Sequence, residues 1–192
     1  MSHDVRTPIN GIQGCVDIAD RYPDDLKLQQ EARTKIRTAS GYLLNLVNDV
    51  LDMNKLESGN IQLERKHFNL LEVLHNTNEI IRVQANESGV NYYVEDGEII
   101  HTQLIGSPVH FQQILMNIGS NAVKYNQDGG SVTVSCREVS YTDTTAEYEL
   151  TCTDTGIGMS EEFQKKAFEP FAQEGQSART KYAGTGLGLA IA

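Results

Sequence analysis

The 192-residue sequence predicts an α+β protein in which an antiparallel helical hairpin precedes a layered domain of helices and mainly antiparallel strands. Two observations lead to this fold class. Apolar residues recur in a heptad-like series in the first third, and they alternate with polar residues in two later segments. A chain of this length has room for one or two modest domains with a buried core. We place the hairpin at residues 1–66 and the layered domain at residues 67–192.

The first third predicts two helices joined by a turn. Residues 3–20 carry apolar side chains at helical spacing, and residues 21–25 combine Pro23 with two aspartates, which is typical of a turn. From Leu28 to Met53, apolar residues recur every three or four positions, the pattern of a helical bundle. Because a lone hairpin buries little surface, we favour a second copy as its partner, in a four-helix dimer. The alternative is that the hairpin packs on the rest of its own chain.

A different pattern begins after a polar linker that ends near residue 66, beyond a helix cap at Gly59. Two of the later segments alternate well, and residues 141–145 suit a hairpin loop between them. Helices and mainly antiparallel strands in one unit indicate an α+β layer fold. The predicted helices span residues 70–88 and 108–126, and the predicted strands span residues 91–95, 102–106, 131–139 and 147–153.

The composition argues against several classes of protein. Asp and Glu number 26 against 16 Lys and Arg, a net charge of −10, whereas broad nucleic-acid binding needs excess positive charge. The sequence has no apolar run of about 18 residues and no signal peptide at its start. Three cysteines are a sparse, odd number that favours a reducing compartment, and no Cys/His spacing indicates a metal site.

Two glycine-rich segments could bring the backbone close to a ligand. Asp154 begins the first, which follows a strand, and its Gly156 and Gly158 allow positive φ or close approach to a flat ligand. The second opens a helix, whose first amides favour phosphate oxygens, but no Gly-Lys-Ser/Thr follows as in a P-loop. Taken alone, the first segment is better explained as an ordinary turn and the second is weak evidence. The glycines of the second segment are Gly184, Gly186 and Gly188.

Two asparagines, Asn117 and Asn121, lie four residues apart on a predicted helix and therefore share a face. Asparagine is a poor helix former, so a pair in mid-helix costs stability unless it has a purpose. Neutral amide oxygens suit Mg²⁺, which accepts phosphates as further ligands. Lys124 and Tyr125 continue near this face, and Gly119 indicates the close approach of another element. The alternative explanation is that both asparagines are simply solvated.

His3 is followed by Asp4, and on a helix it shares a face with Thr7. A nucleophilic imidazole must be neutral, with one nitrogen unprotonated. An adjacent carboxylate can fix its tautomer or take its proton. A lone histidine near a terminus is otherwise structural or merely exposed.

Together these segments resemble the sensor histidine kinases of two-component signalling, in order and in spacing, over nearly the whole chain. Several of the segments are shared with the ATPase superfamily of gyrase, MutL and Hsp90-type proteins, but a histidine ahead of a helical hairpin favours the kinases. The matching segments are the phosphoacceptor box at 3–8, the N box at 117–125, the first glycine box at 154–158, the F box at 168–171 and the second glycine box at 184–189.

The resemblance implies a dimeric helical hairpin followed by an α/β sandwich of the histidine kinase, gyrase and Hsp90 type. It assigns His3 as the phosphoacceptor and Asp4 as the neighbour that handles its proton. Thr7 matches the position that, in related kinases, orients water for dephosphorylation of the partner regulator. The phosphoryl group would pass from ATP to His3, and then to an aspartate on a response regulator receiver domain.

The resemblance also implies ATP and Mg²⁺ as cofactors. Asn117 and Asn121 would hold Mg²⁺ and the phosphates, with Asn121 as the more direct metal ligand, and Asp154 would accept a hydrogen bond from the adenine amino group. Residues 172–183 would form a lid that brings Arg179 and other positive charge. The residues implied to contact the nucleotide are Asn117, Asn121, Lys124, Tyr125, Asp154, Gly156, Gly158, Phe171, Gly184, Gly186, Leu187 and Gly188.

The implied partners are a second copy, bound through the hairpin, and the receiver domain, with no nucleic acid. A membrane would be involved only through a missing upstream sensor, so we expect a cytoplasmic chain. The sequence departs from the family at Ser107, where an Asp is common, and at Asp4, where Glu is commoner. Because the chain starts just before His3 and stops inside a helix at Ala192, we expect a C-terminally truncated piece with weak or absent autokinase activity.

Two other functions stay open from the sequence. One is a dimerisation and phosphotransfer scaffold that does no chemistry unaided. The other is an ATPase of the gyrase and Hsp90 group. It is disfavoured because that group carries a water-activating Glu at the position of Asn117, and an amide cannot act as that base.

Overall fold

The computed structural model describes residues 2–59, 63–174 and 185–192. It divides into two compact units, Met1–Asn60 and Ile61–Ala192, whereas the sequence placed the boundary after residue 66. Within the described ranges, no helix combines the length and the apolar character needed to cross a lipid bilayer.

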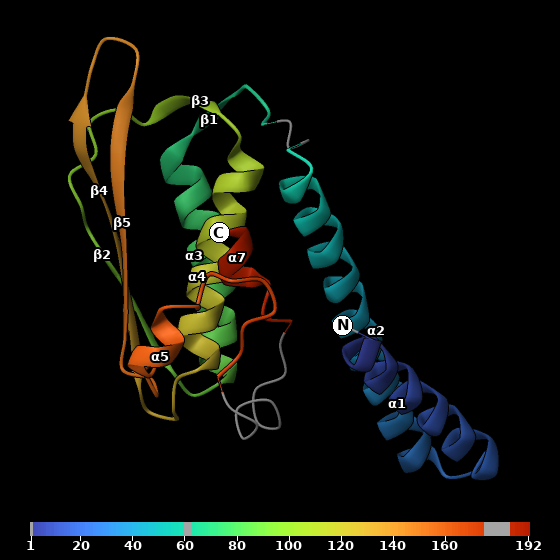
Figure 1. Cartoon of the computed structure of the whole chain (residues 1–192). Coiled ribbons are helices and arrows are strands. Elements are labelled where there is room, and N and C mark those ends of the chain that lie inside the picture. The colour runs from blue at the N-terminus through green and yellow to red at the C-terminus, as the bar shows by residue number, and fades with distance from the viewer. Residues whose placement is uncertain (1, 60–62, 175–184) are drawn as a thin grey trace. The chain divides into compact units, whose positions relative to one another are not determined.

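The first unit is the predicted helical hairpin, formed by α1 (Ser2–Arg21) and α2 (Leu26–Glu57) (Figure 1). Asp25 caps α2, because its carboxylate accepts the backbone N–H groups of Lys27 and Leu28 at 3.1 and 3.0 Å. Gln29 then ties the two helices together, since its Nε2 donates to the carbonyl oxygen of Ala19 at 2.7 Å. The turn is therefore fixed by side chains that bond to backbone.

Much of the apolar side of the hairpin is uncovered in a single chain. Among its described residues, the buried side chains are those of Pro8, Ala32 and Leu46. Leu44 and Leu51 of α2 are 61% and 52% exposed, and each lies one residue after a member of the predicted apolar series, Leu43 and Val50. The other exposed apolar side chains of this unit are Ile9, Val16, Ile18, Tyr22, Leu26 and Val47.

The second unit is a layered arrangement in which α3 and α4 lie on one face of a three-stranded sheet (Figure 1). The sheet has the order β2-β4-β5, with β2 parallel to β4 and β4 antiparallel to β5, and a separate antiparallel pair joins β1 to β3. The elements are β1 (Lys66–Asn69), α3 (Leu70–Glu87), β2 (Asn91–Glu95), β3 (Gln103–Gly106), α4 (Pro108–Lys124), β4 (Ser131–Tyr141), β5 (Ala146–Asp154), α5 (Glu161–Gln164) and α7 (Gly188–Ile191).

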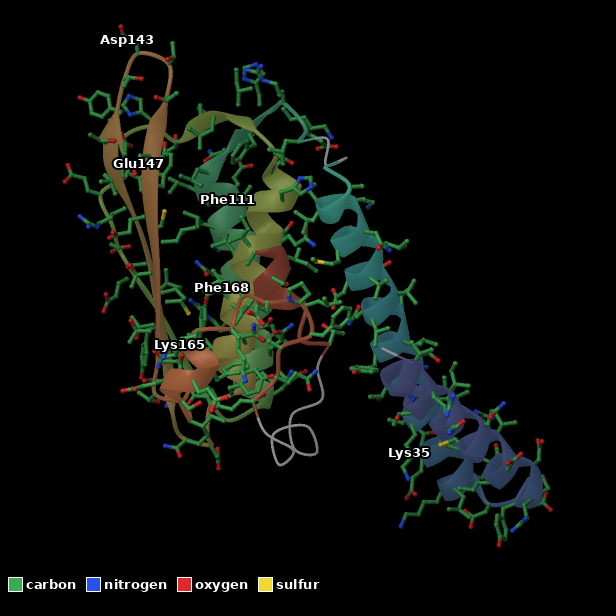
Figure 2. The ribbon with its side chains drawn as sticks, viewed as in Figure 1. Lys35, Phe111, Asp143, Glu147, Lys165 and Phe168 are labelled. Atoms are coloured by element: carbon green, nitrogen blue, oxygen red, sulfur yellow. The ribbon has the colours of Figure 1, made fainter. Side chains whose placement is uncertain are left out.

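The helices and strands predicted for the second unit are confirmed to within two residues at each end, and two features differ. The sequence assigned residues up to about 66 to a linker, but Lys66 begins a short strand that pairs with Gly106 of β3. The sequence also gave no sign that β2 and β4 run parallel, in the register Asn91 to Ser131. The β4–β5 hairpin turns where predicted, with Asp143 near its tip (Figure 2).

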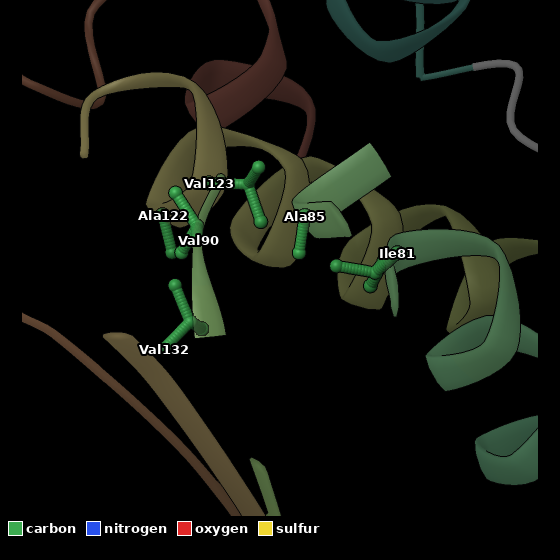
Figure 3. Packing of buried hydrophobic residues seen from close by; sticks show 6 residues of the cluster. All are labelled: Ile81, Ala85, Val90, Ala122, Val123 and Val132. Carbon is green, nitrogen blue, oxygen red and sulfur yellow. The ribbon is translucent and has the colours of Figure 1, made fainter. Parts of the chain in front are cut away.

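The core of the second unit joins both helices to the sheet. Ile81 and Ala85 of α3 pack with Val123 of α4 and Val132 of β4 (Figure 3). The close approach predicted at Gly119 is confirmed, because a Cβ there would lie 2.5 Å from Cδ1 of Ile81. A cavity of about 590 Å³ also lies between the sheet and these helices.

The cysteines of the sheet are free thiols, as predicted. Cys136 of β4 lies opposite Leu150, and Cys152 of β5 lies opposite Val134, so the two cysteines are diagonal neighbours on the helix-covered face. Burial raises the pKa of Cys152 to about 11, and the carboxylate of Asp154 adds to the shift.

Candidate functional site

The polar face of α4 meets the start of α7. The side-chain amide of Asn117 donates to the carbonyl oxygen of Gly188 at 3.0 Å. A Cβ built on Gly188 would lie 3.8 Å from Oδ1 of Asn117 and 3.9 Å from Nδ2 of Asn121. The structure therefore brings both predicted asparagines to one glycine of the second glycine-rich segment.

That segment fits closely against the chain that precedes it. Gly186 has φ +70°, and a Cβ there would lie 2.8 Å from the carbonyl oxygen of Ala172 and 2.9 Å from the carbonyl carbon of Phe171. Leu187 is fully buried, and its N–H donates to Oγ1 of Thr185 at 3.2 Å. A side chain at position 186 would thus collide with backbone, which explains the glycine.

The first glycine-rich segment is fixed to the end of α4. Oδ1 of Asp154 accepts the N–H of Gly156 at 2.8 Å, and the N–H of Ile157 donates to the carbonyl oxygen of Tyr125 at 3.0 Å. A Cβ on Gly156 would lie only 2.5 Å from that same carbonyl oxygen. Gly158 has φ +68° and open space around it, so it is required for its conformation alone.

A positive charge lies at the same end of α4. Nζ of Lys124 is 4.7 Å from the centre of the Tyr125 ring and 3.2 Å from its hydroxyl, so the ammonium group lies over the ring. Both side chains are half-buried, and they extend the face that carries Asn121. This part of the site can attract an anionic group.

The F-box residues differ in their surroundings. Phe168 is 70% exposed and lies in the turns that follow α5. Phe171 is 44% exposed and has φ +64°, a left-handed conformation that is uncommon for an aromatic residue. The structure brings Phe171 to the second glycine-rich segment through its backbone, which lies against Gly186.

Several predicted residues lie wholly or partly outside the described structure. His3, Asp4 and Thr7 belong to α1, but the side chains of His3 and Asp4 are not among those described. Gly184 and Arg179, together with most of the proposed lid at 172–183, also fall outside the described residues.

No three His, Cys, Asp or Glu side chains group as a metal site in the parts of the chain that the structure describes. A divalent ion at the α4 face would therefore take amide oxygens of Asn117 and Asn121 and the oxygens of a bound ligand, a set that suits Mg²⁺. The lining of the cavity of about 590 Å³ does not include Asn117, Asn121 or Asp154, so the cavity is separate from this site.

The sequence missed one residue of this region. Asn126 is only 6% exposed, and its Nδ2 donates to the carbonyl oxygen of Ser131 at 2.9 Å. Its position before Gln127-Asp128-Gly129-Gly130 indicates an ordinary turn, in which asparagine needs no further explanation. A buried asparagine cannot be distinguished from a solvated turn residue by sequence pattern.

Comparison with known proteins identifies two families along the chain. Residues 1–59 match the family model described as "His Kinase A (phospho-acceptor) domain". Residues 106–192 match the one described as "Histidine kinase-, DNA gyrase B-, and HSP90-like ATPase". The sensory/regulatory protein RpfC of Xanthomonas campestris pv. campestris is 32% identical over all 192 residues, which span 26% of that protein.

Solved structures agree with the fold. Full-length ShkA in complex with AMPPNP has a TM-score of 0.68 and 27% identity, and the match covers 99% of this chain and 38% of that one. The histidine kinase ThkA in complex with response regulator protein TrrA has a TM-score of 0.64 and 20% identity, which supports the fold alone. That match covers 90% of this chain and 48% of the other.

The chain spans about a quarter of the length of the curated relatives it matches. The two family matches follow the order predicted from the sequence, with the phosphoacceptor segment first and the ATPase segment second. The helical hairpin followed by an α/β sandwich is likewise the predicted fold. The chain therefore belongs to the sensor histidine kinases, with a phosphoacceptor domain followed by an ATP-binding domain.

Proposed function

We propose that this chain is the core of an ATP-dependent protein-histidine kinase. The observation that carries the proposal is the meeting of Asn117 and Asn121 with Gly188, where the predicted magnesium ligands and the predicted phosphate loop could act on a single nucleotide. The hairpin that carries His3 precedes this site in the sequence and matches the phosphoacceptor family.

The reaction replaces one bond to phosphorus with another. An imidazole nitrogen of His3 attacks the γ-phosphorus of ATP in line, the bond from phosphorus to the bridging oxygen breaks, and ADP leaves. Asp4 accepts the proton that the imidazole loses as its nitrogen becomes bonded to phosphorus. The phosphoryl group then passes to an aspartate on a receiver domain. The histidine kinase ThkA, which shares the fold of this chain, was solved in complex with the response regulator TrrA. That complex supports this choice of partner.

Each part of the nucleotide has a group suited to hold it. The bond from Gly156 to Oδ1 fixes the carboxylate of Asp154, whose other oxygen can accept the adenine amino group. Asn121 and Asn117 offer amide oxygens to Mg²⁺, and Lys124 offers positive charge. The AMPPNP in the ShkA complex, an ATP analogue, supports this choice of ligand. The described cysteines are free thiols, which agrees with a cytoplasmic site where ATP is available.

The absence of a carboxylate at position 117 favours transfer over hydrolysis. Asn117 directs its N–H toward the carbonyl oxygen of Gly188 and has no basic group with which to activate water. A γ-phosphoryl group held here would therefore not be hydrolysed before it is transferred to the imidazole of His3.

The apolar side of the hairpin supports a homodimer. Leu44, Val47 and Leu51 are each more than two-fifths exposed on α2, although their spacing is that of a buried bundle seam. A second hairpin would cover these side chains in a four-helix bundle, and Thr7 would then lie on the exposed part of α1, where a receiver domain could reach it.

One incubation tests the proposal. The protein is mixed with Mg²⁺ and γ-labelled ATP. We expect label on the protein that is labile in acid and stable in alkali, at the low level predicted for a truncated piece. His3→Gln should abolish this label, whereas His101→Gln, which changes an exposed histidine of the second unit, should keep it. Free phosphate without protein label would instead identify an ATPase, and nucleotide binding with neither product would identify a scaffold.

A further inference from the structure

Asn126 is a buried polar residue at a junction of three chain segments. It lies two residues after the end of α4, and its side chain contacts Ser131 at the start of β4 and Thr155, the residue after β5. Within the described core, it and Thr77 are the buried polar side chains, and Thr77 bonds only within its own helix, to Val73. Asn126 instead connects segments that are distant in sequence.

The connection runs through a closed set of hydrogen bonds. Nδ2 of Asn126 donates to the carbonyl oxygen of Ser131 at 2.9 Å, and that same oxygen accepts the N–H of Thr155 at 3.0 Å. In return, the N–H of Ser131 donates to Oγ1 of Thr155 at 2.8 Å. The hydroxyl proton of Thr155 has two acceptors at 3.4 Å, Oδ1 of Asn126 and the oxygen of Ser131.

The chain makes room for this set of bonds at a neighbouring glycine. A Cβ on Gly130 would lie 2.2 Å from Oδ1 of Asn126 and 3.0 Å from Oγ1 of Thr155. Any larger residue would therefore push the amide and the hydroxyl out of place. The hydrogen bonds of the junction therefore require a glycine at position 130.

The junction lies between the two halves of the proposed nucleotide site. Thr155 is bonded covalently to Asp154, the residue proposed to select adenine. Asn126 is bonded covalently to Tyr125, whose carbonyl oxygen accepts the N–H of Ile157. Because both ends are held, the position of the Asp154 carboxylate relative to Asn121 on α4 depends on the link from Asn126 to Thr155. This link runs mainly through the backbone of Ser131, with one direct contact of 3.4 Å between the two side chains.

We infer that Asn126 and Thr155 are positioning residues that set the preference for adenine. The inference rests on the proposed nucleotide site and extends it: the phosphates are held by the α4 face, whereas base selection needs Asp154 at a fixed place, which these two side chains determine. Loss of either side chain should weaken the binding of ATP and leave the weaker binding of GTP, which depends on the phosphates, nearly unchanged.

The test is the ratio of the ATP and GTP affinities, measured by calorimetry with Mg²⁺ on the full chain. Thr155→Val keeps the shape and removes the hydroxyl, and it should lower ATP affinity about tenfold, the effect of one lost hydrogen bond of about 1.4 kcal/mol. Asn126→Ala should do the same, and the double variant should lose no more than either single one, because both act through one junction.

Two matched variants serve as controls. Thr153→Val makes the same chemical change two residues earlier, at an exposed position of β5, and it should keep the wild-type ratio. Thr155→Ser keeps the hydroxyl that Thr155→Val removes, and it should therefore keep most of the wild-type ATP affinity. Thermal unfolding of each variant establishes that it folds.

The outcomes are distinct. A folded Thr155→Val or Asn126→Ala protein that keeps the wild-type ratio, or that loses ATP and GTP affinity equally, would overturn the inference. If both variants unfold, the junction is needed for the stability of the fold, and the inference is overturned as well. Wild-type protein that binds neither nucleotide would refute the proposed function instead.

Discussion

The side-chain amide of Asn117 donates a 3.0 Å hydrogen bond to the carbonyl oxygen of Gly188, 71 residues further along the chain. This bond joins the middle of α4 to the first residue of α7. It holds the second glycine-rich segment over the face that also carries Asn121. The nucleotide site that we propose depends on this contact.

Asn117→Asp tests the contact directly. A carboxylate has the shape of the amide but no N–H to donate, and it would place negative charge beside both a carbonyl oxygen and the phosphates. We expect ATP affinity to fall by at least about tenfold in calorimetry, since one hydrogen bond is lost and a repulsion is gained. Asn86→Asp adds the same charge at an exposed position of α3 and should bind ATP as the wild type does.

Gly186→Ala should be more damaging than a comparable change elsewhere. Gly186 and Gly129 have nearly the same left-handed φ, +70° and +76°, so alanine costs about 1 kcal/mol of backbone strain at either position. At 186 the new Cβ would also lie 2.8 Å from a carbonyl oxygen, whereas at 129 it meets open space. Gly186→Ala should therefore lower both the unfolding temperature and ATP affinity more than Gly129→Ala. Equal effects would contradict the packing described for Gly186.

Glu138 should make stability depend on pH. Its side chain is 4% exposed, and its carboxylate accepts the N–H groups of His101 and Ile100 at 2.8 and 2.9 Å. The backbone bond from His101 is the main cause of a pKa below the usual value for this carboxyl, an effect that exceeds the opposing influence of burial. A carboxyl with a lowered folded-state pKa stabilises the protein above its unfolded-state pKa, and this contribution disappears as the pH falls through the folded-state value.

Glu138→Gln should therefore be less stable than wild type at pH 7, and the difference should shrink as the pH falls below about 4.5. Urea unfolding between pH 3 and pH 7 measures the difference. Glu95→Gln, an exposed change on β2 of the same sheet, provides the control. A difference between wild type and Glu138→Gln that stays constant with pH would show that the carboxylate charge has no part in the effect.

Cys152 should react slowly with alkylating reagents in the folded protein. Burial is the main reason that its pKa is about 11 instead of 9.0, so the thiolate fraction at pH 8 falls about a hundredfold. The greater nucleophilicity of a more basic thiolate offsets part of this, which leaves a rate reduced about tenfold. Mass spectrometry after timed exposure to iodoacetamide should show slow labelling in the native state and rapid labelling in urea. Similar rates in both states would contradict the burial of this thiol.

The sequence predicted those parts of the fold that depend on local periodicity. The heptad-like series from Leu28 to Met53 is confirmed as α2, and the alternating residues of β4 and β5 are confirmed as a hairpin. The strand β1 was missed because four residues, two of them exposed, provide too little alternation. The parallel pairing of β2 with β4 was missed because it joins segments 40 residues apart and has no local signal.

The site shows the same division. Glycines and asparagines at recognisable spacing led to the residues that we propose for it, and the clash at Gly156 explains why that position lacks a side chain. The junction formed by Asn126 and Thr155 was not predicted, because each residue is ordinary in its own segment. The role of the junction depends on how close the two segments lie in space, and a single sequence does not give that distance.

The connectivity of the two units has a consequence for the order in which they fold. The contacts of α1 with α2 join neighbours across a four-residue turn, so little chain entropy is lost when they form. The pairing of Asn91 with Ser131 must close a long loop that contains another strand and a whole helix. We expect the hairpin to fold first on the ribosome, and the sheet to form only after β4 has been synthesised.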